Sequence, residues 1–342
     1  FMSVMYRMRF SDLAIVESEN GKNWKKSSEK FPDAVFAAKL FKAHDMLDVL
    51  RDTKQPRFLK GAFSTRILGA RIGVLPDGRE LNKAYSLFAP HLMIHDEVSN
   101  SHWDVIYQNP NGKFAYIYTK EKAKISKTEK FKKVGEFNKI VLKLKRNLVS
   151  NLNEDPMALA MLVLLKTKMR VGNEIYYLKT KHKGLTTLKK EDVKIKGSKI
   201  IFDYIGKDGV PQKKEYDFPE KIINSLKKLM RGKENKDFLF VGTNGHPLKD
   251  LAFEASFEKY CGKRFYPHIV RSAYATKQVQ DFLKNRRKVG KIEVEKLYTC
   301  IADELGHKKF SKKKDLWETS YQVTINHYIA PELVSKVAKI TV

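Results

Sequence analysis

The sequence predicts an α+β fold, in which a small β-rich N-terminal domain precedes a mostly α-helical domain with a small antiparallel three-stranded sheet. Three stretches support this prediction. Aromatic-rich runs on both sides of an Asn-Pro-Asn-Gly turn at 109–112 are typical of a β-hairpin. Residues 193–218 contain three short strand-like runs separated by glycine-containing turns. The apolar run 157–165 begins a series of helical patterns that continues towards the C-terminus.

Length and charge narrow the class of protein. The 342 residues are enough for two domains, and 67 Lys+Arg against 39 Asp+Glu give a formal net charge of +28. Such a surface favours polyanionic partners, above all nucleic acid. The longest apolar run is too short to span a bilayer and no signal peptide is evident, so we expect an intracellular protein in the nucleus, the cytoplasm or a virion. Cys261 and Cys300 give neither a disulfide framework nor a metal-like pair.

The residue pattern changes twice along the chain, which predicts three parts. Residues 1–118 form the β-rich domain, residues 119–134 a linker or hinge with seven lysines, and residues 135–342 the helical domain. The simplest interpretation of the linker is a solvated segment, whose lysines would also contact phosphates if a nucleic acid lay beside it. The helices expected in the third part are 157–168, 219–230, 267–283 and 294–305.

Several common kinds of chemistry have no motif in this sequence. There is no GxxxxGK[ST] phosphate loop, no GxGxxG after a strand and no HExxH zinc motif. His91 and His95 have the i, i+4 spacing of metal ligands, but no third ligand is evident, so structural or surface histidines are the preferred interpretation. We therefore expect neither a metal nor a cofactor.

Two basic residues occupy positions that turns would hold. Arg170 is expected between the apolar helix, which Gly172 would stop, and a helix that Asn173 begins. An arginine fixed there suits bidentate phosphate binding, although any helix end can carry an arginine. Lys207 lies at the tip between the second and third expected strands. It is either a solvated turn lysine or a general acid that enters a nucleic-acid groove.

Two histidines and a second arginine lie at expected helix ends. His268 and Arg271 have the i, i+3 spacing that puts them on one face near the start of a helix. His307 follows Gly306 at the end of the next helix, where a histidine can simply interact with the helix dipole. Each of these residues alone has an ordinary structural explanation.

Combined with a tyrosine, these residues predict phosphoryl transfer without a metal. Two guanidinium groups and an imidazole can neutralise the non-bridging oxygens of a pentacoordinate phosphate, and a lysine can protonate the departing sugar oxygen. A tyrosine, whose pKa is ordinarily about 10, can attack when nearby cations stabilise its phenolate. The candidate nucleophiles are Tyr321 and Tyr328, in the stretch SYQVTINHYIAP at 320–331.

The same segments carry a family resemblance. Residues 169–193, MRVGNEIYYLKTKHKGLTTLKKEDV, resemble the RVGNxxY…GLTTL segment of the type IB DNA topoisomerases, especially the small poxvirus and bacterial forms. FDYIGKDGV at 202–210 is similar to the family's lysine loop. LGH at 305–307 and YIAPEL at 328–333 are similar to its histidine and tyrosine motifs. The resemblance extends from residue 120 to the C-terminus, and the N-terminal part matches only loosely.

The resemblance implies a reaction and a set of roles. Arg170, Lys207, Arg271 and His307 would activate a DNA phosphate for attack by Tyr328. The implied product is a 3′-phosphotyrosyl adduct with a free 5′-hydroxyl, followed by strand rotation and religation, so that supercoiled duplex DNA is relaxed without ATP or metal. The family also implies a clamp around the duplex with the lysine-rich linker as its hinge. We expect a monomer, and the further residues expected to contact DNA are Asn173, Tyr176, His268, Thr276, Lys132 and Lys133.

One departure from the family pattern leaves alternatives open. The position of His268 is usually lysine in the small topoisomerases, whereas His-x-x-Arg is typical of tyrosine recombinases, which share the catalytic domain and the covalent chemistry. The alternative function is therefore a tyrosine site-specific recombinase or a hairpin telomere resolvase, against which the GLTTL segment argues. A non-catalytic DNA-binding protein with the same fold is a third hypothesis, which the complete set of five residues opposes.

The choice between the two tyrosines depends on spacing and context. Tyr321 is 14 residues after His307 and Tyr328 is 21 residues after it, and the small family members have the shorter spacing. Context favours Tyr328, because YIAPEL matches the family's Tyr-aliphatic-x-Pro run. We therefore predict that Tyr328 is the nucleophile, that Tyr321 is a packing residue, and that KKFSKKKDLWETSYQV is an insertion.

Overall fold

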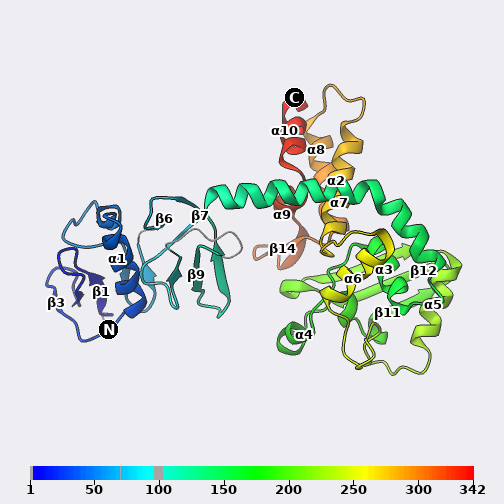
Figure 1. Ribbon diagram of the computed structural model, residues 1–342, viewed down its shortest axis with the longest axis horizontal. Coiled ribbons are helices and arrows are strands. Elements are labelled where there is room, and N and C mark those ends of the chain that lie inside the picture. Colours follow the sequence, from blue (N-terminus) through cyan, green and yellow to red (C-terminus); the bar gives the residue numbers. More distant parts are fainter. Residues whose placement is uncertain (1–2, 70, 96–102) are drawn as a thin grey trace. The chain divides into compact units, whose positions relative to one another are not determined.

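The structure is a computed structural model that describes residues 3–69, 71–95 and 103–342. The chain forms two compact units, Phe1–Glu129 and Lys130–Val342. The first unit is rich in strands, and the second is mostly helical with one antiparallel three-stranded sheet (Figure 1). The predicted α+β class is therefore confirmed.

In its described residues, the first unit consists of short antiparallel strands, the helix α1 and the beginning of a second helix, α2, described below. Its elements are β1 (Met5–Met8), β2 (Ile15–Ser18), β3 (Lys25–Lys26), α1 (Pro32–Ala43), η1 (Leu47–Leu50), β4 (Ala62–Phe63), β5 (Ile67–Leu68), β6 (Ile72–Val74), β7 (Glu80–Tyr85), β8 (Met93–Ile94), β9 (Val105–Gln108) and β10 (Phe114–Ile117). The strand orders are β3-β2-β1-β4-β5, β10-β9-β8 and β6-β7. The hairpin predicted around 109–112 is present, because β9 pairs with β10. Apolar side chains from the strands and α1 form one core.

The second unit contains the elements that carry the candidate site. They are α2 (Lys120–Ser150, which begins in the first unit), α3 (Pro156–Thr167), α4 (Glu174–Thr180), η2 (Leu185–Thr187), η3 (Lys190–Asp192), β11 (Val193–Lys196), β12 (Lys199–Ile205), η4 (Lys207–Gly209), β13 (Pro211–Asp217), α5 (Glu220–Met230), α6 (Asp250–Cys261), α7 (Ile269–Leu283), α8 (Lys291–Glu304), β14 (Lys308–Ser311), β15 (Leu316–Thr319), α9 (Gln322–Tyr328) and α10 (Pro331–Ile340). The three strands predicted in 193–218 form the sheet β11-β12-β13. The four predicted helices correspond to α3, α5, α7 and α8, whereas α6, α9 and α10 were not predicted.

Two hydrophobic cores organise this unit. The larger core surrounds α3, whose apolar residues face all sides and are almost all buried. The smaller core lies among α7, α8, α9 and α10. Residues of α7 belong to both cores, so α7 connects them. In the part of the chain that the structure describes, no helix combines the length and the apolar character needed to cross a membrane.

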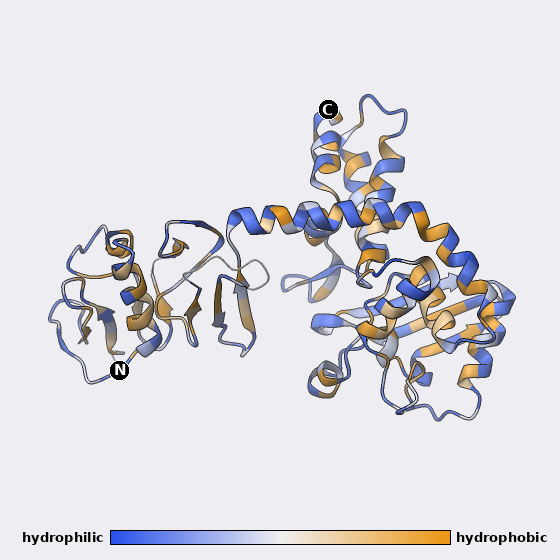
Figure 2. Cartoon of the chain, in the orientation of Figure 1, coloured by the Kyte–Doolittle hydropathy of each residue, from blue (hydrophilic) through white to orange (hydrophobic). Residues whose placement is uncertain are grey.

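A continuous helix, α2, contains the segment that was predicted to be a lysine-rich linker or hinge. Its sequence is rich in Lys and also contains Glu and Leu, all of which are good helix formers. Its buried residues, Val134, Phe137, Leu144 and Leu148, have helical spacing and belong to the larger core. Figure 2 shows that the rest of α2 is largely hydrophilic. The boundary between the two units falls inside α2. A hinge at 119–134 stays a prediction.

Candidate active site

Arg170 lies in an extended segment between α3 and α4, and the GLTTL stretch holds this segment. The helix α3 ends at Thr167, close to the predicted end at 168, and its C-cap residue Lys168 adopts the left-handed conformation with φ 53°, so Lys168 and not Gly172 ends the helix. The backbone amides of Leu185 and Thr186 donate to the carbonyl oxygens of Arg170 and of the next residue, at 2.8 and 2.7 Å. The backbone that carries the Arg170 side chain is therefore fixed on both sides.

A close backbone contact explains why the RVGN and GLTTL segments each contain a glycine. A Cβ atom on Gly184 would lie 2.6 Å from the nitrogen of Gly172 and 2.7 Å from the carbonyl oxygen of Arg170. The amide of Gly184 also donates to Thr187 Oγ1 at 2.9 Å, which closes the turn. The two segments thus form one structural unit whose function is to position Arg170.

Arg271 extends from the first turn of α7 into the interior and is only 3% exposed. Its Nη1 donates to the carbonyl oxygen of Lys168 at 2.6 Å, and its Nη2 donates to the carbonyl oxygen of Leu305 at 2.8 Å. Nη2 also lies 3.0 Å from His307 Nε2. Nε has no hydrogen-bond partner among the described residues. Burial lowers the pKa of Arg271. The guanidinium group is rigidly held and keeps N–H groups available for an anion.

His307 follows α8, as predicted, and is buried between α7 and α9. Its Nε2 accepts from Arg271, so Nδ1 carries the proton and donates to Thr324 Oγ1 at 2.8 Å. Burial, and then the charges of Arg271 and Arg170, lower the pKa of His307 to about 3. The ring is therefore neutral at neutral pH.

The segment that carries His307 is also tied to the strand that follows the lysine loop. Gly306 has φ 67°, and its carbonyl oxygen accepts from Gln212 Nε2 at 3.0 Å. A Cβ atom on Gly306 would lie 2.2 Å from Gln212 Oε1, so a side chain here would displace Gln212, and the positive φ also favours glycine. Lys308 Nζ donates to the carbonyl oxygen of Pro211 at 3.1 Å. These contacts fix β13 against the histidine segment.

Lys207 lies at the predicted place, in the turn between β12 and β13. The amide of Gly206 donates to the carbonyl oxygen of Val210 at 2.8 Å, and Asp208 adopts φ 61° in the turn. The Lys207 side chain is exposed and lines the cavity described below.

Tyr328 is the last residue of α9 and is 5% exposed. Its hydroxyl lies 3.3 Å from His268 Nε2, and its ring centroid lies 4.9 Å from that of His307 and 5.2 Å from Arg271 Cζ. Burial acts to raise the pKa of Tyr328, but the positive charges of Arg271 and Arg170 outweigh this effect, and the pKa falls below its usual value. Tyr328 is therefore the member of the cluster that can become an anion.

Tyr321 lies at the other end of α9, outside this cluster. It is the N-cap residue of the helix, and its ring centroid lies 6.1 Å from that of Tyr298 in the smaller core. The seven residues of α9 span about 10 Å at 1.5 Å per residue, which separates the two tyrosines. The structure thus brings Tyr328, and not Tyr321, together with the predicted arginines and histidines.

His268 bridges an arginine and the tyrosine. Its Nε2 lies 3.2 Å from Arg170 Nη1 and 3.3 Å from the Tyr328 hydroxyl. Burial, followed by the charges of Arg271 and Arg170, lowers the pKa of His268 to about 3. Neutral His268 therefore accepts at Nε2, where Arg170 and the Tyr328 hydroxyl share one lone pair, and it orients both groups.

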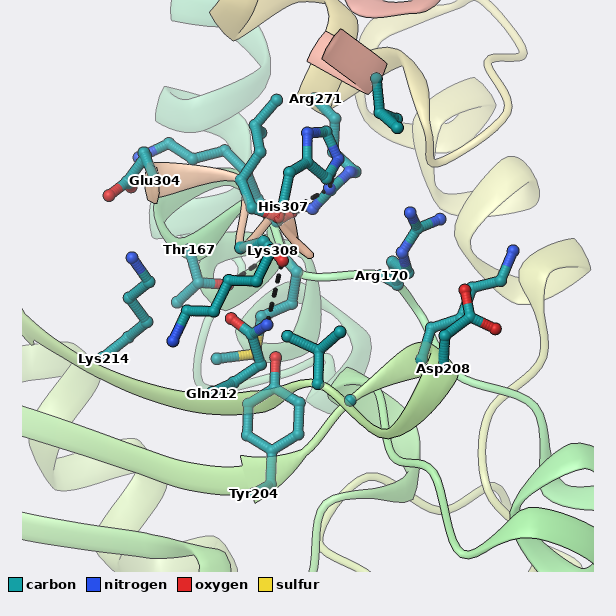
Figure 3. Close-up of a pocket in the computed structure, with 18 of the residues that line it drawn as sticks. Thr167, Arg170, Tyr204, Asp208, Gln212, Lys214, Arg271, Glu304, His307 and Lys308 are labelled. Atoms are coloured by element: carbon teal, nitrogen blue, oxygen red, sulfur yellow. Dashed lines mark hydrogen bonds and ion pairs between the residues drawn. The ribbon is translucent and has the colours of Figure 1, made fainter. Parts of the chain in front are cut away.

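A cavity of about 590 Å³ opens beside this cluster. Figure 3 shows Arg271, His307 and Arg170 along one side of it, with Tyr204 and Gln212 on the opposite side. Its lining includes Lys207 and other cationic side chains, against the two carboxylates of Asp208 and Glu304. The cationic lining makes the cavity suitable for an anion such as a phosphate group.

The remaining predicted DNA-contacting residues lie in different environments. Asn173 caps α4, with its Oδ1 accepting from the amide of Tyr176 at 3.0 Å, and the Tyr176 side chain is 58% exposed. Lys132 and Lys133 are exposed on α2. Thr276 is buried and its hydroxyl donates to the carbonyl oxygen of Tyr328 at 3.3 Å. Thr276 therefore supports the tyrosine from within the protein.

Three residues that sequence reasoning missed also support the cluster: Thr324 behind His307, Gln212 at Gly306, and Lys130. Lys130 Nζ donates to the carbonyl oxygen of His327 and lies 5.4 Å from the Tyr328 ring centroid. The lysine-rich composition of its segment pointed to this region. However, Lys130 differs from the neighbouring lysines only in the face of α2 on which it lies.

The histidine pair considered as a metal site lies in the first unit. The ring of His95 stacks on Trp103 with a centroid distance of 4.2 Å, and that of His91 lies 6.5 Å from Phe114. Within residues 3–69, 71–95 and 103–342, no group of three or more His, Cys, Asp or Glu side chains could hold a metal ion.

Comparison with known families identifies the class of protein. The family described as eukaryotic DNA topoisomerase I, catalytic core, matches residues 119–327, which is more than half of the chain. The chain belongs to this family. The matched range contains both arginines, the lysine loop and His307, and it ends one residue before Tyr328.

The individual proteins that resemble this chain share less than a third of their aligned residues with it. The DNA topoisomerase 1B of Acanthamoeba polyphaga mimivirus is 28% identical over 152 residues, which cover 42% of this chain and 45% of that protein, so the chain spans less than half the length of this relative. Among solved structures, the XerH site-specific recombinase bound to difH substrate has a TM-score of 0.33 and 14% identity, with 61% of this chain and 57% of that chain covered. The Tn1549 transposon integrase in complex with circular intermediate DNA has a TM-score of 0.27 and 13% identity, with 49% and 61% covered.

Proposed function

We propose that this chain is a type IB DNA topoisomerase that relaxes supercoiled duplex DNA by cleaving one strand through Tyr328 and rejoining it, without ATP or metal. The observation that carries the proposal is the convergence of a buried tyrosine with two arginines and a histidine beside a cationic cavity. The positive charges of the two arginines lower the pKa of Tyr328, as a nucleophilic phenol requires.

In the proposed reaction, the Tyr328 oxygen forms a bond to phosphorus while the bond from phosphorus to the 5′-oxygen breaks. The phenol proton passes to solvent, because His268, with its pKa of about 3, is a poor base. Lys207 gives a proton to the departing 5′-oxygen, which leaves as a hydroxyl group. The 3′-phosphotyrosyl bond keeps the energy of the broken bond. Attack by the 5′-hydroxyl can therefore rejoin the strand after rotation.

The buried donors would stabilise the charge that develops on the non-bridging oxygens. Arg170 and Arg271 contribute guanidinium N–H groups. His307 can contribute Nε2–H once a phosphate oxygen takes its place as the acceptor for Arg271. The Thr324 hydroxyl can then donate to Nδ1 in place of accepting from it, because a hydroxyl does both. Thr324 thus permits the ring to change tautomer without leaving a buried nitrogen unpaired.

A plasmid assay tests the proposal. The purified chain should relax supercoiled plasmid of either sign in EDTA without ATP, and denaturant should trap a covalent protein–DNA adduct. Tyr328→Phe should abolish both activities, whereas the matched control Tyr321→Phe should keep them. A requirement for magnesium or ATP would refute the proposal. Adduct that persists in Tyr328→Phe and is lost in Tyr321→Phe would reverse the assignment of the nucleophile.

A second candidate function is site-specific recombination, favoured by the His-x-x-Arg arrangement of His268 and Arg271. The hydrogen bond between His268 and Tyr328 makes this histidine part of the cluster. A topoisomerase changes the linking number of a plasmid that has no special site. A recombinase instead gives joined, inverted or hairpin-ended products, and only from its own sites, so product topology separates the two functions.

A further inference from the structure

The β14–β15 hairpin is an element that the proposed reaction does not use. It begins directly after His307 and ends at Thr319, shortly before α9. The two strands pair over four positions, and the amide of Ser320 donates to the carbonyl oxygen of His307 at 2.9 Å. The hairpin, labelled β14 in Figure 1, is therefore a regular ribbon. His307 lies at its base.

Lysines dominate the surface of this hairpin. Residues 308–319 contain five lysines and two carboxylates. One of these carboxylates, Glu318, pairs with Lys314 at 2.7 Å. Lys312 and Lys313 are exposed at the turn, and Lys309 is exposed nearer the base. The tip thus presents a net positive charge.

Contacts at the base and one aromatic pair keep the ribbon ordered. The rings of Phe310 and Trp317 are in edge contact, with centroids 5.4 Å apart. Phe310 is nevertheless 40% exposed. At the base, Lys308 and Lys309 line the same cavity as Arg170 and His307. An anion bound in that cavity would therefore lie at the foot of the hairpin. In addition to the positive charge at the tip, this placement beside the cavity points to an anionic ligand.

We propose that the hairpin is an additional DNA-binding element, which contacts the phosphate backbone of the duplex beside the phosphate that is cleaved. A two-stranded ribbon fits the width of a DNA groove. Four paired residues at about 3.3 Å each span about 13 Å, the axial rise of about four nucleotides. Lys312 and Lys313 would each neutralise a backbone phosphate and release counterions. The inference rests on the proposed function, since it takes duplex DNA as the ligand.

The salt dependence of binding tests this inference in the full chain. The probe is a fluorescent 30-base-pair duplex, and its affinity is measured by anisotropy from 50 to 300 mM KCl. Log affinity falls as log salt rises. Lys312→Gln combined with Lys313→Gln should make this slope shallower by about 2, since each phosphate contact contributes about 0.9 to its magnitude. The matched control is Lys227→Gln with Lys228→Gln on the exposed face of α5, which should change the slope by less than about 0.5.

The outcomes separate this inference from the proposed function. Equal slopes for wild type and the hairpin variant would overturn the inference, and so would equal effects of the hairpin and control variants. At low protein concentration the hairpin variant should form less adduct than wild type, because it binds DNA more weakly. This difference should disappear at saturating protein concentration. A rate that stays low at saturation would mean that the hairpin acts on the cluster, and would also overturn it. If the wild-type chain forms no adduct, but the hairpin substitutions still change the salt dependence of duplex binding as expected, the proposed function is refuted and this inference is not.

Discussion

The candidate site has a buried half and an exposed half that differ in how the protein holds them. Arg271, His307 and Tyr328 are between 3% and 7% exposed, and hydrogen bonds or ring contacts within the second unit hold each of them. Lys207, in contrast, lies on an exposed turn. In the proposed reaction, the phosphate-binding groups would therefore be organised before DNA binds, whereas the proton donor would be placed by a short loop. Substitutions in the buried half should change both stability and rate, and substitutions in the exposed half should change rate alone.

The largest effect is expected from Arg271→Ala. Cleavage in a single turnover should slow by about 10³-fold, because a preorganised donor to the phosphate is lost. The free energy of unfolding should fall by about 2–3 kcal/mol, since the buried carbonyl oxygens of Lys168 and Leu305 lose a charged donor. Urea unfolding followed by circular dichroism measures the second effect. Arg271→Lys, which keeps the charge but not the fork of donors, should recover only part of either loss. Unchanged stability would contradict the assignment of Arg271 to a preorganised half.

Lys207→Ala should separate rate from stability. Adduct formation should slow by about 10²-fold or more, as expected for the loss of a general acid, while the free energy of unfolding changes by less than about 0.5 kcal/mol. The decisive substrate carries sulfur in place of the bridging 5′-oxygen, because a thiolate leaves without protonation. On this substrate Lys207→Ala should match wild type, whereas Arg271→Ala should stay slow. If both variants stayed slow, Lys207 would be a phosphate ligand and not the proton donor.

The sequence predicted the members of both halves but not the contacts that distinguish them. The RVGN and GLTTL segments, the lysine turn and the histidine after Gly306 are local in sequence, and each lies where the sequence placed it. The partners that bury Arg271 come from α3 and α8, far away along the chain. No local pattern encodes such long-range packing. For the same reason Thr276 was expected at the DNA and is instead buried against Tyr328. The segment 119–134 was predicted as a linker or hinge and not as part of a long helix, because its lysines hid the helical spacing of the apolar residues that follow.

The buried histidines should make stability depend on pH. In the folded chain the pKa values of His268 and His307 are lowered to about 3, against about 6.5 in the unfolded chain. Below pH 6.5 the unfolded state therefore binds more protons, and stability is lost as the pH falls from 6.5 towards 3. Between pH 6 and 5, each histidine should contribute a loss of up to about 1.4 kcal/mol per pH unit. Urea unfolding at pH 7.5, 6 and 5 measures this slope. His307→Gln should have a shallower slope than wild type, and equal slopes would show that His307 is protonated in the folded chain.

The smallest of these effects should come from Thr324→Val, which tests whether the buried half is organised beyond the groups that touch phosphate. Valine keeps the shape of threonine but leaves His307 Nδ1 without its 2.8 Å partner. The lost hydrogen bond stabilises the orientation of the ring by about 1 kcal/mol, so its removal should slow cleavage by about fivefold. Thr324→Ser keeps the hydroxyl and should restore the rate, which a purely structural role for the methyl group would not allow. A combination with His307→Gln should add no further loss, because Thr324 acts only through that ring. Losses that add in the double variant would instead place Thr324 in direct contact with the reacting groups.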